Sequence, residues 1–149
     1  MNKLSSLTAY IESFPGIARD RMEAFADLGK LIPTGRDMGN GFEIGRFKYD
    51  AVISVYRCPA SIAPLLLSAI IVWLGVNDPD RDKLELSDPD VDVTLEDEQT
   101  VFVQITVEFV ETLELVEDAA GLITWNGKTW GVDAVDIDIA ETLQKLDKA

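Results

Sequence analysis

Alternating aspartates are the most conspicuous candidates for chemistry in this chain. Asp78, Asp80 and Asp82 stand at the first, third and fifth positions of a possible calcium-binding loop. Such a loop needs glycine at its sixth position and a bidentate glutamate at its twelfth, where this chain has Lys83 and Pro89. A second register that begins at Asp88, with Asp90 and Asp92, places Val93 and Gln99 at those two positions. No calcium loop is therefore predicted, and only a weak, non-specific divalent-ion site among these carboxylates stays open.

Other catalytic arrangements are also poorly supported. The chain has no histidine, which removes the usual general base and every Ser-His or Cys-His pair. Cys58, the single cysteine, follows Arg57, which could lower its pKa, but it has no possible His partner, and we interpret it as a small semi-buried residue. The glycines at 35, 39, 41 and 45 match no phosphate-binding motif, and no pair stands out among the 27 acids. We predict that the protein is not an enzyme and holds no cofactor and no metal.

The composition indicates one acidic domain that spans residues 1–149. A chain of this length with 47% hydrophobic residues can bury a sizeable core. The 27 Asp and Glu against 13 Lys and Arg give a net charge of −14. This charge repels nucleic-acid phosphates and anionic lipids, so binding to either is not expected. One cysteine and no apolar signal segment favour the reducing cytoplasm.

The nineteen uncharged residues 58–76 could span a membrane or form a buried helix. Pro64 suits the first turn of a helix, with Ser61 near its cap. About a dozen residues then remain, roughly 18 Å of helix against a hydrocarbon core of about 30 Å. We predict a buried helix that ends at Gly75. Asn77, Asp78, Pro79 and Asp80 then turn outward to water, with the Asp side chains bonded to nearby backbone N–H groups.

The rest of the chain divides into helices, a glycine-rich loop and strands. Apolar residues at steps of three and four predict amphipathic helices over 4–14 and 17–28, and the density of Gly and Pro predicts a loop over 33–45. Alternation and β-formers predict a strand or strand pair over 42–57, and antiparallel strands over 84–95 and 101–110 joined by a turn at 96–99. Asn126-Gly127 predicts a type I′ hairpin, and 139–146 a short helix.

The expected fold class is therefore α+β. Its antiparallel or mixed sheet carries two N-terminal helices, one buried central helix packed on the sheet, a β-hairpin and a short C-terminal helix.

Residues 46–125 carry a recognisable series of elements. An extended "KYDAVISVY" is followed by an apolar helix ending in Trp73-Leu74 and by the element Asn77-x-Pro79-Asp80. The acidic stretch 88–92 then leads into "VFVQITVEFV", which closes on Glu111 and is followed by "ELVEDAAG" and Leu122. In this series the chain resembles the phage tail completion protein R family of contractile-tailed temperate phages. The fold expected from it is similar to that of tail terminators.

The resemblance implies a structural role in the virion and no catalysis. Proteins of this family complete the contractile tail: they cap the head-proximal end of tube and sheath and join it to the neck. A homohexameric ring is implied, assembled in the cytoplasm of the bacterial host. The implied partners are tail tube, tail sheath, and neck or head-completion proteins, while DNA passes through without specific binding and no membrane is involved. The alternative is a small acidic module that binds a divalent ion or a protein.

A cyclic ring needs a heterologous interface, which exposed groups on hairpins or terminal helices can supply. Trp125 and Trp130 flank the Asn126-Gly127 turn and are candidates, although both can instead simply cover the core. The glycine-rich loop is the second candidate, as a segment that orders on contact with a partner. The candidate interface residues are Arg36, Asp37, Met38, Phe42, Trp125, Asn126 and Trp130.

Overall fold

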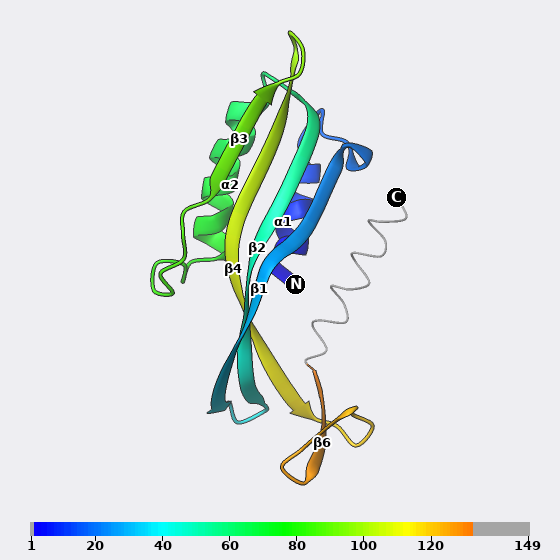
Figure 1. The fold of residues 1–149 in the computed structure, drawn as a ribbon, viewed down its shortest axis with the longest axis vertical. Helices are drawn as coiled ribbons and strands as arrows, with labels where there is room; N and C mark the ends of the chain where they lie inside the picture. The colour runs from blue at the N-terminus through cyan, green and yellow to red at the C-terminus, as the bar shows by residue number, and fades with distance from the viewer. Residues whose placement is uncertain (1, 133–149) are drawn as a thin grey trace.

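The structure, a computed structural model, describes residues 2–132 of the chain. Two α-helices, a short 3-10 helix and one six-stranded sheet make up this part (Figure 1). In chain order they are α1 (Asn2–Glu12), η1 (Arg19–Arg21), β1 (Met22–Asp37), β2 (Phe42–Pro59), α2 (Ala63–Asn77), β3 (Asp90–Leu95), β4 (Thr100–Glu117), β5 (Ile123–Trp125) and β6 (Lys128–Val132).

The sheet is antiparallel throughout, with the strand order β1-β2-β4-β6-β5. β2 and β4, each of 18 residues, pair along almost their whole length and form its centre. On its other side β4 pairs with β3 over residues 101–106 and with β6 over residues 115–117. Helices α1 and α2 lie on one face of the upper part of the sheet (Figure 1).

The expected α+β class is wrong, because half of the described residues lie in strands and 22% are helical. The two N-terminal helices reduce to one, α1. The predicted C-terminal helix at 139–146 lies outside the described residues.

The segment predicted as a second helix, 17–28, contains η1 and the start of β1. Met22, Ala24 and Ala26 pair with Val55, Ile53 and Ala51 of β2, all three fully buried. Tertiary pairing along a core strand overrides the helical spacing of Ile17, Met22, Phe25 and Leu28, which is a weak preference on its own.

The loop predicted over 33–45 is a strand pair around a short turn. β1 runs to Asp37 and β2 begins at Phe42, and Met38 N donates a hydrogen bond to Gly41 O at 2.8 Å. The glycines are accommodated by shifts of pairing register, one of them between Pro33 and Arg36. At Gly45 an added Cβ would lie 2.8 Å from Ile32 O, so glycine there permits close approach of the two strands.

Several other elements are confirmed. α1 buries Leu4, Leu7 and Ile11 in the core, and β2 covers the predicted strand 42–57. β3 and β4 are antiparallel neighbours, although β3 begins only at Asp90 and β4 extends to Glu117. The hairpin turn at Asn126-Gly127 has φ values of 55° and 75°, as a type I′ turn requires.

Helix α2 packs on the sheet as predicted (Figure 1), but it is buried on one side only. Pro64 lies in its first turn and Ser61 adjoins the N-cap residue, Ile62, as expected, but the helix continues past Gly75 to Asn77. Its inner side buries Leu66, Ile70, Trp73 and Leu74, whereas its outer side exposes four apolar residues: Leu65, Ile71, Val72 and Val76. Within residues 2–132 no helix is long and apolar enough to cross a bilayer.

Candidate interaction surfaces

The element Trp73-Leu74…Asn77-x-Pro79-Asp80 fastens the end of α2 to the rest of the fold. The Trp73 ring lies 6.4 Å from that of Phe109 and 6.5 Å from that of Tyr10, measured between centroids. The Asn77 side chain donates a hydrogen bond to Trp73 O at 3.0 Å, which satisfies a carbonyl of the last helical turn. Buried packing and helix termination therefore account for this element.

Asp78 overturns the prediction that the turn after α2 faces outward throughout. It is 3% exposed, and its two carboxylate oxygens accept hydrogen bonds from Lys3 Nζ at 2.7 Å and Arg81 Nη1 at 2.8 Å. Buried carboxylates are stable only when they are paired in this way. Asp80, two residues on, is on the surface, 3.9 Å from Lys83 Nζ.

The two cations that hold Asp78 also complete the edge of the sheet. Between its partners β3 and β6, β4 has a stretch without a neighbouring strand among the described residues. There Arg81 Nη1 donates to Glu108 O at 2.8 Å, and Lys3 Nζ donates to Val110 O at 2.9 Å. Asp78, Lys3 and Arg81, called the edge-capping triad below, thus replace strand hydrogen bonds with side-chain ones.

The edge-capping triad argues against a divalent-ion site that uses Asp78. Asp78, the first position of the calcium loop considered above, pairs with two cations, Lys3 and Arg81, and the exposed Asp80 lies near Lys83. Among residues 2–132 there is no group of three or more acidic or cysteine side chains placed to hold a metal.

Two further titratable groups, Tyr49 and Cys58, are structural. The buried Tyr49 hydroxyl donates a hydrogen bond to the Glu111 carboxylate; burial first, and Glu111 second, raise the pKa of Tyr49. Cys58, predicted to be semi-buried, is fully buried. Burial, with a smaller effect of Glu96, raises the pKa of the Cys58 thiol, so Arg57 does not activate it.

The candidate interface residues from two distant segments come together at the lower end of the molecule (Figure 1). The Phe42 ring lies 4.8 Å from that of Trp125, which lies 5.6 Å from that of Trp130. Trp130 Nε1 donates a hydrogen bond to Trp125 O at 2.8 Å. A hollow of about 230 Å³ lies between the β1–β2 turn and the β6 side, lined by residues that include Asp37, Phe42 and Trp130.

We call this region, residues 36–42 and 123–132, the hairpin end. Met38 is 43% exposed, and Asn126 lies at the tip of the β5–β6 turn. Arg36 pairs in register with Glu43 on β2 rather than joining the aromatic contacts. The two tryptophans lie far from the main core, which contains neither of them.

We expect Gly127→Ala to lower the free energy of unfolding by about 1 kcal/mol, because φ is +75° there and a Cβ is strained in that region. Gly75→Ala is the matched control. A Cβ meets nothing within 4 Å at either glycine, but Gly75 lies in α2, where alanine should stabilise by about 0.5–1 kcal/mol. Urea denaturation of the two variants should give shifts of opposite sign; a shift of the same sign in both would contradict the turn geometry.

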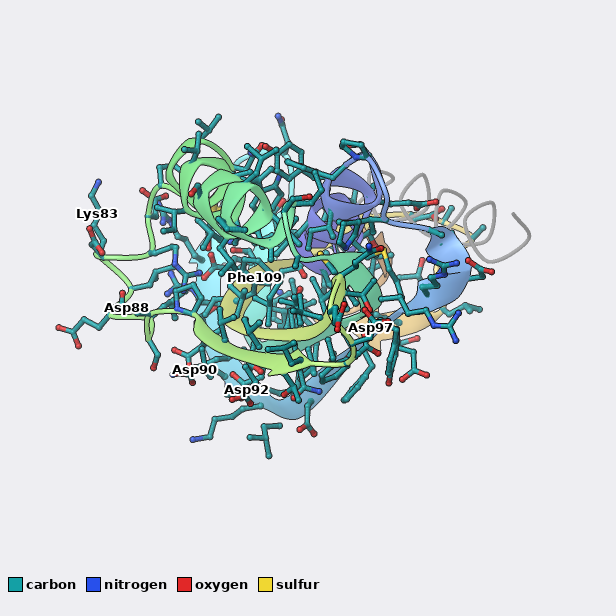
Figure 2. All side chains as sticks on the ribbon, turned by 90° about the horizontal axis from the view of Figure 1, so that it is seen from above. Lys83, Asp88, Asp90, Asp92, Asp97 and Phe109 are labelled. Atoms are coloured by element: carbon teal, nitrogen blue, oxygen red, sulfur yellow. The ribbon has the colours of Figure 1, made fainter. Side chains whose placement is uncertain are left out.

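The face of the sheet opposite the helices carries a row of carboxylates. Asp27 pairs in register with Asp50, and Asp50 with Glu108, on three neighbouring strands. Asp90 and Asp92 of β3 extend the acidic side beyond them, pointing away from the helices (Figure 2). Lys48 Nζ lies 3.7 Å from the Glu108 carboxylate and neutralises part of this negative charge. Like charges directly opposite each other on neighbouring strands are destabilising, so this acidic face lowers the free energy of unfolding.

We expect Asp50→Asn to raise the free energy of unfolding at pH 7 by about 0.5 kcal/mol. Desolvation, then the charges of Glu108, Asp27 and Asp90, raise the pKa of Asp50 above its unfolded value. The wild type therefore loses stability as pH rises through that pKa, and the gain from Asn should shrink as the pH falls toward 4. Denaturation curves at several pH values test this, with Asp88→Asn as a control outside the strands; an equal gain at every pH would contradict it.

Comparison with known proteins places the chain among phage proteins. A family model described as "P2 phage tail completion protein R (GpR)" matches residues 1–134. The chain is 30% identical over 141 residues to an uncharacterised 19.2 kDa protein in the rep–hol intergenic region of Haemophilus phage HP1, strain HP1c1, covering 92% of this chain and 85% of that protein. No solved structure matches significantly.

Proposed function

Because the chain belongs to the P2 phage tail completion protein R family, we propose that it caps the head-proximal end of a contractile tail as a homohexameric ring. Its coarser role, phage tail completion in association with other tail components, follows from the family itself. In the proposed ring it closes the tail tube and sheath and makes the joint to the neck or head-completion proteins. This role is structural and requires no catalytic group.

The observation that supports the ring proposal best is the difference between the two faces of the sheet. Within the described residues, α1 and α2 cover one face of the sheet, and the other face is bare and acidic. A subunit that is thicker on its helical side packs around an axis with the bare side inward. The row Asp27, Asp50 and Glu108 then lines the channel.

An acidic lining suits a channel through which DNA must pass. Proteins that bind DNA neutralise its phosphates with lysine and arginine, and each such contact adds affinity for the DNA. Carboxylates instead repel the phosphates, so the proposed channel leaves DNA free to move. Passage of DNA through the channel is then the reason why the sheet keeps like charges that lower its stability.

The hairpin end is the proposed contact to the tail tube, the sheath or the neck. Its exposed Met38 and its cluster of Phe42, Trp125 and Trp130 have the aromatic and apolar composition of interaction surfaces. They lie outside the main core, which supports the interface interpretation of the two tryptophans over the covering one.

Light scattering coupled to size exclusion on the full chain tests the ring. The proposal expects a particle of six copies, stable on dilution. A particle that stays a single copy at high protein concentration would count against a ring, and with it against the capping mechanism.

A further inference from the structure

We propose that the copies of the ring join edge to edge, with β3 of one subunit pairing antiparallel with the first half of β1 in the next. This inference rests on the proposed function and identifies the surfaces that build the ring. Its partner is a second copy of this chain.

Both edges of the upper sheet are open among the described residues. β1 pairs only with β2, and β3 only with β4. The stretch Met22–Asp27 of β1 is paired without a bulge, and the first register shift follows Asp27. β3 is also six residues long. Long, regular, uncovered edges are templates for strand addition, and native proteins otherwise blunt them.

The direction of the two edges suits a ring. Each of the three steps from β1 through β2 and β4 to β3 is antiparallel, so β1 and β3 run in opposite directions. A rotation about an axis along the strands leaves strand directions unchanged. Copies related by that rotation therefore present β3 and β1 to each other as an antiparallel pair.

The height of the two edges suits closure. Ala24 lies opposite Ile53, Ile53 opposite Ile105, and Ile105 opposite Val91. The open edges thus lie at the same level along the strands. A heterologous contact without a rise closes into a ring, whereas a contact with a rise grows into a helix.

The two sides of the sheet differ in charge: one is near neutral and the other is strongly acidic. Residues 19–57, which hold η1, β1 and β2, contain seven Lys and Arg against six Asp and Glu, whereas residues 78–118 contain two against fifteen. η1 carries Arg19 and Arg21 immediately before β1. At the same end of the sheet, the β3–β4 turn carries Glu96, Asp97 and Glu98, all exposed. Edge-to-edge joining sets these arginines against that turn.

Apolar contacts accompany the strand pairing. On the helical side, β3 exposes Val91, Val93 and Leu95 at 42%, 50% and 76%. These three residues pair with the buried Ile105, Val103 and Val101 of β4, but they are themselves exposed. Beside them lies a groove of about 740 Å³ whose lining includes Leu67 and Ile71 of α2. At this level residues 90–93 of β3 lie opposite residues 22–25 of an incoming β1. That edge covers Val91 and Val93, and its backbone adds roughly four hydrogen bonds, two for every second residue of the paired stretch.

Disulfide trapping tests the pairing on the full chain. In Ala24→Cys combined with Val91→Cys, mild oxidation should give a ladder of covalent species up to six copies under denaturing, non-reducing conditions. Neither single variant should cross-link to itself, because the contact is heterologous. Ala24→Cys with Met38→Cys is the control, since Met38 lies beyond the far end of β1; it should give no ladder. Cys58 stays in place because it is fully buried.

A charge swap provides an independent test. Arg21→Glu should raise the concentration at which half the chains are assembled by about tenfold or more, and Glu98→Arg should do the same. The double variant should return to within about threefold of the wild type.

The outcomes separate this inference from the proposed function. A six-copy particle without a ladder and without rescue by the double swap means that another surface joins the copies; the edge pairing is then overturned while the ring stands. A single-copy particle without a ladder overturns both, whether residues 133–149 of the same chain or another tail protein occupies the edges. A ladder together with rescue establishes the pairing.

Discussion

Replacing Asp78 with asparagine should lower the free energy of unfolding by about 3 kcal/mol, the low end expected when one partner of a buried ion pair is removed. The loss is large because the Asp78 side chain is 2% exposed and pairs with both Lys3 and Arg81. Asparagine keeps the shape but leaves two cations facing a neutral amide. Lys3, at 27% exposure, recovers some hydration, which keeps the loss from being larger.

The effect should extend beyond Asp78 itself. The same Lys3 and Arg81 bond Val110 O and Glu108 O on the open stretch of β4. When the carboxylate no longer positions the cations, both carbonyls return to water. The N-terminus of α1 then keeps its hydrogen bond from Asn2 N to Glu111 but loses the one from Lys3 to Val110 O. Hydrogen exchange should therefore rise along α1 and the middle of β4.

Urea denaturation at a fixed protein concentration measures the loss, since assembly shifts apparent stability. Asp80→Asn is the matched control, because Asp80 is two residues away and its side chain is 69% exposed. It should change stability by less than about 0.5 kcal/mol. Equal effects for Asp78 and Asp80 would contradict the edge-capping triad.

Replacing Trp73 with alanine should cost about 3–5 kcal/mol, the range for truncating a buried aromatic side chain. Trp73 is 8% exposed and joins three elements, because its ring contacts Tyr10 of α1 and Phe109 of β4. The cavity left behind lies where α1, α2 and β4 meet, so it cannot be filled by moving one helix alone.

Calorimetric melting of the Trp73→Ala variant checks this expectation. Val76→Ala is the control on the same helix, at a residue that is 73% exposed. Val76→Ala should leave the melting temperature nearly unchanged. Trp73→Ala should lower it strongly, because the expected loss in the free energy of unfolding is a large fraction of a typical domain stability of 5–15 kcal/mol. A small loss at Trp73 would mean that α2 is not held to the sheet by this contact.

The parts of the fold that were predictable are those set by local sequence. The Asn126-Gly127 turn needs positive φ angles that few residue pairs adopt, so its hairpin could be identified. The alternation of "VFVQITVEFV" identified β4, because one face of that strand is fully buried over residues 103–109. The element at 73–80 identified the family, which the comparison with known proteins confirms.

The parts that failed are those decided by tertiary contact. β1 has a helical spacing of large apolar residues, and only its pairing with β2 makes it a strand. Asp78 could not be distinguished from Asp80 in the sequence, since its partners Lys3 and Arg81 are brought to it by the fold. The presence of Lys3 in a nearly uncharged first helix was the available signal, and it was too weak to assign a partner.

The candidate interface residues show the same division. Their types and turn positions indicated two segments, 36–42 and 125–130, but not that Phe42 and Trp125 touch. The open edges of β1 and β3 were not predicted, because an edge is a property of the whole sheet.

We propose that this protein caps the tail where it meets the head. Gold labelling of an affinity tag on the full chain in intact virions, viewed by electron microscopy, tests it most directly. We expect label at the junction of tail and head and nowhere else on the particle. Label along the tail, label at its distal tip, or virions without label would contradict it.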